Sequence, residues 1–570
     1  MTRPLPDTAA ALARATWDDI VPWFDELQAR PLDDESIPAW LADWSTLEAL
    51  IMEAASRAMI RYTVDTRDTE AEADYRRFST SILPQADERS VALQKRLVAS
   101  GYRTPEFDTA IERFRTSIEI FREANVPLQS ELEELGANYQ KITGGMTAEW
   151  DGARIPLPRL QPFLKSLDRG VRERAWRASV APYVSQRDEM ASLFDRMYAL
   201  RQQVARNAGF ASYRDYVFRA KFRFDYTPAD CGRFHDAVAD TVMPAYRRLM
   251  AHRQAFLGVE SLRPWDLAVE LHDREAVRPF SDGAELAARA HEVFERVDPT
   301  LGREFGTMID ERLLDLDSRE GKAPGGYCDT LHVSGRPFIF MNAVGLTDDV
   351  NTLLHEAGHA FHAFASHHLP LLWQRHPGSE MAELASMSME LLAAPHLRRP
   401  AGFFAPEEWR QARLDHLEDV IITLAHVASI DAFQHWVYTD PAGADAAARD
   451  AAWLRIRSRF EQGVDWSGLE PERIARWYRQ LHVFLYPFYY IEYGIAQLGA
   501  LQVWRNSLRD PVGAVARYRE ALALGATRPL PALYEAAGVR LAFDAATIGE
   551  LVGLVEAEIL RLRAETPQPA

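Results

Sequence analysis

The chain has 570 residues, of which 47% are hydrophobic and 26% charged, as in an ordinary globular protein. Its formal net charge of −18 argues against a nucleic-acid-binding protein, which needs a basic surface. The two cysteines, Cys231 and Cys328, are too few for a disulfide scaffold and favour a reducing compartment.

Residues 1–20 contain early acidic residues and no continuous apolar segment, so they do not resemble a secretory signal. No stretch approaches about eighteen uninterrupted apolar residues, the length needed to span a bilayer. We therefore expect a cytoplasmic protein that binds neither membranes nor nucleic acids.

The N-terminal quarter of the chain has the pattern of successive helices. Apolar residues repeat at spacings of three and four over 40–64, 70–100, 107–123 and 129–142. Gly144 and Gly145 then break the pattern, and residues 148–157 predict a hairpin around an Asp-Gly turn. We expect a helical lobe over 1–145, a catalytic domain over 146–563 and a disordered tail over 564–570.

Helical patterns return over 158–300 and 407–480. The histidines of the first stretch have no metal-ligand spacing, and those of the second are spaced irregularly, so we expect structural roles for them. These histidines are His235, His252, His272, His291, His416, His426 and His435.

Between them, residues 322–342 predict a strand preceded by glycines. Gly325 and Gly326 permit close approach of another backbone, Tyr327 follows them, and the apolar run at 337–341 is typical of a strand. The strand either offers an edge to a ligand or simply supports the helix that follows.

Residues 355–359 form the motif His-Glu-x-x-His. On a helix, His355 and His359 lie one above the other and can share a tetrahedral metal, while Glu356 can act on water at that metal. The opposite face of the same helix is apolar, and the histidine face includes His362. This pattern predicts a helix that turns its histidines into a cleft.

A zinc ion bound by two histidines needs a third protein ligand. A second helical run begins after Gly378, and Glu383 and Glu390 lie seven residues apart on one face of it. We predict Glu383 as the third ligand and Glu390 as a partner that orients an imidazole.

A dense aromatic patch follows at residues 481–494. Tyr486, Tyr490 and Tyr493 would share a helical face if the helix continues through Pro487, and His482 lies beside them. Such a stripe is usually core, but Tyr O–H and His N–H groups can also stabilise an oxyanion. Tyr489 competes for the same role in a shifted frame.

The segment His-Glu-Ala-Gly-His-Ala-Phe-His, with the Glu-Leu-Ala-Ser run from Glu383, resembles the M3 family of zinc metallopeptidases. The resemblance is strongest to oligoendopeptidase F and extends to thimet oligopeptidase. The chain has Ala357 where the family usually has Phe or Leu. His482 lies four residues before Tyr486, whereas thimet-type members are expected to have five.

The resemblance implies a mostly α-helical, two-lobed peptidase with a deep cleft and a small β-sheet beside the catalytic helices. It implies one Zn²⁺ per chain, short peptide substrates and a monomer or homodimer. Glu356, Tyr490, Tyr493 and His482 would be catalytic, and His362 and Glu390 would support the ligands. Gly325, Gly326, Tyr327 and Tyr486 would bind substrate.

Two alternatives stay open at this point. A metallocarboxypeptidase of related helical fold uses the same motif with a downstream Glu, but it would release single C-terminal residues and hold the terminal carboxylate with a basic group. A binding protein that captures peptide or zinc without turnover would lack the base or the oxyanion donors.

Overall fold

The computed structural model describes residues 3–271 and 277–565. It is mainly helical, with a two-stranded hairpin and a three-stranded sheet among these residues. This confirms the predicted fold class. His272 and the tail at 566–570 lie outside the described residues, and the predicted deep cleft stays a prediction.

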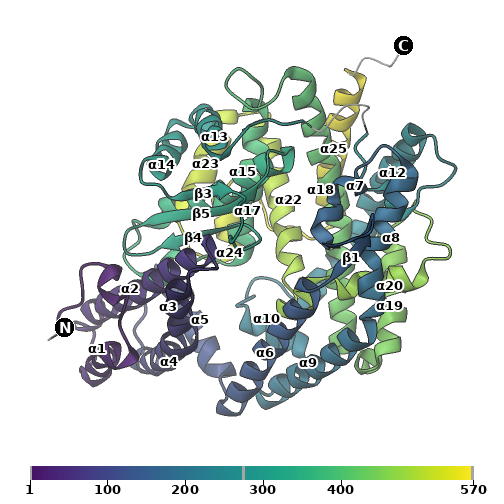
Figure 1. Cartoon of the computed structure of the whole chain (residues 1–570). Helices are drawn as coiled ribbons and strands as arrows, with labels where there is room; N and C mark the ends of the chain where they lie inside the picture. The colour runs from purple at the N-terminus through teal and green to yellow at the C-terminus, as the bar shows by residue number, and fades with distance from the viewer. Residues whose placement is uncertain (1–2, 272–276, 566–570) are drawn as a thin grey trace.

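The first five long helices form a compact group around their own core (Figure 1). They are α1 (Trp17–Ala29), α2 (Ile37–Val64), α3 (Thr69–Arg77), α4 (Leu83–Ser100) and α5 (Asp108–Ile120). Helix α6 (Val126–Gly144) instead contributes Tyr139 to the larger core, and the Tyr139 hydroxyl donates to the Tyr478 carbonyl at 3.0 Å. The separate core thus ends before α6, whereas the sequence places the boundary near residue 145, and that division stays a prediction.

Helix α2 joins this group to the rest of the protein. The Trp373 ring lies 4.3 Å from the Trp44 ring between centroids, and its indole N–H donates to Glu48 at 3.0 Å. The buried Glu53 carboxylate accepts the backbone N–H groups of Val333 and Ser334 at 2.7 and 2.9 Å. The turn at 332–335 and the short helix Leu372–Arg375 are therefore anchored on α2.

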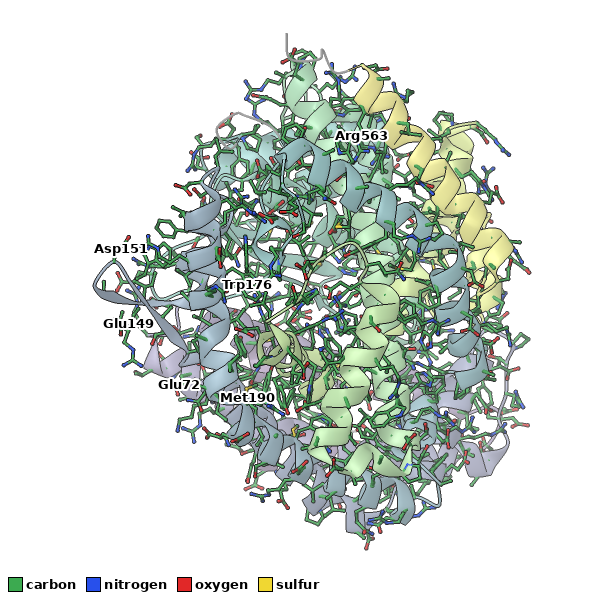
Figure 2. The ribbon with its side chains drawn as sticks, turned by 90° about the vertical axis from the view of Figure 1, so that its right-hand side faces the viewer. Glu72, Glu149, Asp151, Trp176, Met190 and Arg563 are labelled. Carbon is green, nitrogen blue, oxygen red and sulfur yellow. The ribbon has the colours of Figure 1, made fainter. Side chains whose placement is uncertain are left out.

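The predicted hairpin is present as β1 (Thr147–Trp150) and β2 (Ala153–Pro156), paired antiparallel. Asp151 and Gly152 both have positive φ, as a two-residue turn of this kind requires. Figure 2 shows Asp151 at the tip of the hairpin, projecting from the surface.

Among the described residues, eight α-helices lie between the hairpin and the three-stranded sheet. They are α7 (Gln161–Leu164), α8 (Arg169–Ser185), α9 (Arg187–Asn207), α10 (Tyr213–Ala220), α11 (Pro228–Ala237), α12 (Met243–Leu257), α13 (Gly283–Val297) and α14 (Pro299–Asp310). Residues 272–276, between α12 and α13, are not among those described.

The sheet contains β3 (Leu314–Asp317), β4 (Tyr327–Leu331) and β5 (Arg336–Ala343) in the order β3-β5-β4. The central strand β5 pairs parallel with β3 and antiparallel with β4. Strand β4 therefore has one ladder neighbour and lies at an edge of the sheet. Both β4 and β5 pack against α15 (Thr347–Ser366), the helix that carries the His-Glu-x-x-His motif.

The remaining helices build the centre and the far side of the protein (Figure 1). They are α15 (Thr347–Ser366), α16 (Leu372–Arg375), α17 (Ser379–Ala393), α18 (Pro406–Thr439), α19 (Ala446–Phe460), α20 (Glu470–Tyr478), α21 (Leu481–Leu485), α22 (Tyr490–Ser507), α23 (Pro511–Ala523), α24 (Leu530–Ala536) and α25 (Ala545–Ala564). Helix α17 packs against both α15 and α22.

Helix α18 is the one described helix that is long and apolar enough to cross a membrane. However, 67% of its most apolar window is buried inside the fold. Core residues of α18 such as Leu417, Leu424 and Phe433 are fully buried. Its apolar character is therefore accounted for by packing within the protein.

Gly358 allows α15 and α17 to cross closely. A Cβ atom at this position would lie 2.5 Å from Ser386 Cα and 2.7 Å from the Ala385 carbonyl oxygen. Because both contacts are with the backbone of α17, no side-chain rotation can relieve them. The glycine inside the motif therefore fixes how near Glu383 comes to the two histidines.

We expect Gly358→Ala to destabilise the protein by about 1–3 kcal/mol, because the added methyl must force the two helices apart. The matched control is Gly553→Ala on the exposed face of α25, where nothing lies within 4 Å of the new Cβ. Removing a helical glycine there should stabilise by up to about 1 kcal/mol. Urea unfolding of both variants measures the difference, and equal stability would contradict the close-crossing account.

Candidate metal centre

Helix α15 presents His355 and His359 one turn apart, with their ring centroids separated by 5.0 Å. Asp349 caps the start of the helix by accepting the Leu346 backbone N–H at 2.8 Å. The residues that anchor the opposite face in the core are Val350, Leu353, Leu354, Ala357 and Phe361. The two imidazoles are thus held on the face predicted from the sequence.

Helix α17 brings Glu383 to these histidines. Glu383 Oε2 lies 3.4 Å from His355 Nε2 and 3.9 Å from His359 Nε2. One donor atom from each of the three residues lies within 4.8 Å of the others. Two imidazole nitrogens and a carboxylate oxygen around one point are the donor set of a catalytic zinc site, so these residues fit the metal that the sequence predicts.

Glu390 lies seven residues, or about two turns, further along α17 and contacts two histidines. Its carboxylate contacts His355 Nδ1 at 2.8 Å and His416 Nε2 at 3.1 Å. Burial alone would raise the Glu390 pKa, but the hydrogen bonds to His355 and His416 outweigh it and hold the pKa at about 2. The carboxylate therefore engages Nδ1 of His355 and leaves Nε2 directed at Glu383, as expected of a group that orients a metal ligand.

The charges around the site favour a cation. Burial opposes protonation of His355, but Glu383 and Glu390 overcome it and raise the His355 pKa to about 10. Burial lowers the pKa of His359 to about 4. The two buried carboxylates thus stabilise positive charge beside them, while His359 stays neutral as a metal ligand must be.

Glu356 is buried at 9% exposure and is not one of the three grouped donors. Burial raises its pKa to about 7, and the neighbouring His355 partly opposes this shift. A hydrogen bond from the backbone of Cys328, on β4, also lowers the pKa of the Glu356 carboxyl group. A carboxyl group with a pKa near neutrality, between the metal ligands and a strand edge, has the properties of a general base.

Tyr489 also belongs to the site. Its hydroxyl donates to Glu383 Oε1 at 3.0 Å, while the Ser386 hydroxyl donates to Glu383 Oε2 at 3.2 Å. Both oxygens of the predicted ligand are therefore oriented by hydroxyl groups. From the sequence, Tyr489 is only a competitor for the role of oxyanion donor, because no spacing rule indicates that its phenol reaches α17.

The chain does not continue as one helix through Pro487, so the condition under which Tyr486, Tyr490 and Tyr493 would share a helical face is not met. Helix α21 ends at Leu485 and α22 begins at Tyr490. Phe488 between them has φ of +63°, a conformation that costs a bulky residue about 1–2 kcal/mol. Tyr486 is 53% exposed and does not share a helical face with Tyr490 and Tyr493.

The backbone of Phe488 is held on both sides. Its N–H donates to the Gln434 side-chain oxygen, and its carbonyl accepts from the Arg223 guanidinium. Arg223 is itself paired with the buried Glu492 at 2.7 Å. These contacts maintain the turn that directs Tyr489 toward Glu383.

The two tyrosines of α22 have different surroundings. Burial raises the pKa of Tyr493, and the charges of Glu383 and Glu356 contribute to the rise. The Tyr490 hydroxyl instead donates to Gln480 at 3.2 Å, and its ring packs 5.5 Å from His426. Tyr493 is therefore the α22 phenol whose environment includes the metal centre.

His482 lies among the aromatic residues of this segment. Its ring centroid is 5.0–6.0 Å from those of four tyrosines, Tyr486, Tyr489, Tyr490 and Tyr493. Burial lowers its pKa, and the nearby Lys221 contributes to the same shift. The patch is thus a real cluster in space, although its members do not lie on one helix.

Three of the four residues predicted to bind substrate lie at the start of β4, and the fourth is Tyr486. Gly325, with φ of +100°, and Gly326 are exposed, and the Gly325 carbonyl accepts from the Asn342 side chain at 2.9 Å. Tyr327 stacks on Phe340 with 4.9 Å between centroids, and its hydroxyl lies 2.6 Å from the Thr63 hydroxyl. The Tyr327 side chain therefore links the sheet to α2.

His362 is 5% exposed, and burial lowers its pKa to about 3. Its Nε2 atom has no hydrogen-bond partner in the described part of the chain. Its predicted role in supporting the metal ligands stays a prediction. Cys328 and Cys231 are both free thiols, which confirms the expectation of no disulfide.

Comparison with known proteins accounts for most of the chain. Residues 163–552 match the model of peptidase family M3, and residues 8–112 match the M3 N-terminal domain. An oligoendopeptidase F homolog of Lactococcus lactis subsp. lactis is 22% identical over 379 residues, which cover 64% of this chain. Oligopeptidase PepF of Bacillus subtilis is 23% identical over 388 residues, or 66% of this chain.

The chain spans 59% and 55% of the lengths of these two relatives. The structural matches are more complete. PZ peptidase A, with an inhibitor, has a TM-score of 0.88 and 26% identity, covering 96% of this chain and 98% of its own. A putative oligoendopeptidase F has a TM-score of 0.87 and 26% identity, covering 96% and 97%. Because the family model matches well over half of its residues, the chain belongs to peptidase family M3.

Proposed function

We propose that the protein is a zinc-dependent endopeptidase that hydrolyses internal bonds of short peptides. The observation that carries the proposal is the grouping of one donor atom each from His355, His359 and Glu383 within 4.8 Å. The buried Glu356 lies on the same helix as the two histidines. Family membership, and relatives named as oligoendopeptidases and oligopeptidases, support a peptidase acting on oligopeptides.

His355, His359 and Glu383 would hold the metal, one ion per chain. When bound, zinc in such a site acts as a Lewis acid toward a carbonyl and makes water a stronger nucleophile. Glu390 and Tyr489 keep His355 and Glu383 directed at it through hydrogen bonds of 2.8 and 3.0 Å. The site is therefore built to keep its ligands in place.

Glu356 would accept the proton of the attacking water and return it to the departing amine. The role suits a carboxyl group whose pKa burial has raised to about 7, since a base works best when its pKa is near the operating pH. Tyr493 would donate a hydrogen bond to the oxygen that becomes negatively charged during attack.

The free edge of β4 would receive the substrate backbone. Among the described strands β4 pairs with β5 alone, and Gly325 and Gly326 before it carry no side chain to obstruct an approaching peptide. Pairing through the main chain would tolerate many substrate sequences.

Localisation in the cytoplasm and a monomeric or homodimeric state stay predictions.

The first test replaces the proposed base. We expect Glu356→Gln to lower kcat by about 10²–10⁴-fold, because the amide cannot accept a proton. Zinc content, measured by mass spectrometry of the metal, should remain that of the wild type, since Glu356 is not among the grouped donors. Mass spectrometry of a mixed short-peptide library gives the cleavage products.

Internal cleavage by the wild type supports an endopeptidase, whereas stepwise loss of C-terminal residues would indicate the carboxypeptidase alternative. No turnover by zinc-loaded wild-type protein would leave a binding protein. Full activity of Glu356→Gln would refute its role as base.

The second test compares two tyrosines of one helix. Tyr493→Phe should lower kcat by about 10²–10³-fold if its hydroxyl stabilises the oxyanion. Tyr490→Phe is the matched control, because the Tyr490 hydroxyl is already bonded to Gln480 at 3.2 Å. Steady-state kinetics with a fluorogenic peptide measure both. A larger loss in Tyr490→Phe would reverse the assignment.

The third test concerns Glu390. We expect Glu390→Gln to weaken zinc binding by about 10–100-fold, because the neutral amide no longer supports His355 as a ligand. Competition with a chromogenic chelator measures the zinc affinity directly. Glu535→Gln on α24 is the control, since this exposed acid loses the same charge outside the histidine cluster. Unchanged zinc affinity in Glu390→Gln would show that Glu390 serves folding alone.

A further inference from the structure

A second group of potential ligands lies away from the proposed catalytic centre. Cys231 and His235 are four residues apart on α11, and Asp431 and His435 are four residues apart on α18. Residues at this spacing point the same way from a helix, and α11 packs against α18. Two helices therefore turn two pairs of metal-binding side chains toward each other.

Ligand atoms of Cys231, Asp431 and His435 lie close together, and His235 contacts the Asp431 carboxylate beside them. One ligand atom each from Cys231, Asp431 and His435 lies within 4.8 Å of the others. Asp431 Oδ2 lies 2.8 Å from His235 Nε2 and 3.3 Å from His435 Nε2. Cys231 and Asp431 are 0% exposed, and His235 is 7% exposed.

Hydrogen bonding within the group leaves a ligand atom unsatisfied. Asp431 Oδ1 is buried and forms no hydrogen bond in the described part of the chain, whereas His435 Nε2 lies 3.3 Å from Asp431 Oδ2. A buried carboxylate oxygen without a partner is costly to maintain. A purely structural Asp-His cluster would explain the contacts with His235 and His435, but neither the unpaired Asp431 Oδ1 nor the position of Cys231.

We propose that Cys231, His235, Asp431 and His435 form a second, structural metal site that binds Zn²⁺. A thiolate, two imidazoles and a carboxylate make four ligands of the types zinc prefers, with no position left for substrate. The sulfur ligand disfavours Mg²⁺ and Ca²⁺, which select oxygen.

The position of this site suggests its purpose. The His435 ring packs against Phe488 with 5.3 Å between centroids, and the preceding residue, Gln434, accepts the Phe488 N–H. Phe488 forms the turn that directs Tyr489 to Glu383. A metal at this site would fix α11 to α18 beneath that turn, and so support the catalytic centre without touching substrate.

The test is cobalt substitution of the full-length protein, produced with Co²⁺ as the only added transition metal. Ligation of Co²⁺ by a thiolate gives a charge-transfer absorption in the near ultraviolet, which His and Glu ligands do not give. The proposed catalytic centre contains no cysteine. We expect two cobalt ions per chain in the wild type, together with the thiolate band.

Three variants assign the band, since the chain has only two cysteines. Cys328→Ala should keep the band and both ions. Cys231→Ala should lose the band and retain one ion, and Cys231→Ser serves if the alanine variant does not fold. His359→Ala should lose the catalytic ion and keep the band, so that the second site is tested independently of peptidase activity.

The proposal is overturned if wild-type protein binds one cobalt ion per chain without a thiolate band. It is also overturned if the band disappears in Cys328→Ala but persists in Cys231→Ala. The wild-type spectrum and metal count show whether a thiolate binds metal at all, and Cys328→Ala together with Cys231→Ser assigns that thiolate to one of the two cysteines.

Discussion

The close crossing of α15 and α17 is the constraint on which the proposed centre depends. His355 and His359 are placed by the pitch of one helix, but Glu383 comes from another helix and reaches them only because the backbones approach at Gly358. A methyl group there would lie 2.5 Å from Ser386 Cα. The surrounding architecture follows from this contact, since β5 supports α15 on one side and α22 covers α17 on the other.

The charges around the proposed centre also favour a bound cation. Glu383 and Glu390 are a buried and a partly buried acid on one face of α17, and their carboxylates are compensated by His355, His359 and His416. Desolvation alone would neutralise both acids, yet the histidine contacts hold both their pKa values below the ordinary range. The result is a buried site with negative charge directed at one point, which is the environment that a divalent cation requires.

The sequence was most informative where the chemistry depends on a single helix. The spacing of His355 and His359 and the shared face of Glu383 and Glu390 were predictable, because helical pitch determines both. The role of Tyr489 was not, since a proline and a positive-φ phenylalanine end one helix and reset the direction of the next. Likewise, the two four-residue spacings of Cys231 with His235 and Asp431 with His435 are visible in the sequence, but only the packing of α11 on α18 relates them.

The proposed function requires one divalent metal between His355, His359 and Glu383. Anomalous diffraction at the zinc absorption edge tests this, with crystals of zinc-loaded protein that is active before crystallisation. We predict a strong anomalous peak within bonding distance of all three residues, and its loss in crystals of His359→Ala. Active, zinc-loaded crystals with no anomalous peak at these residues would show that the metal does not bind there.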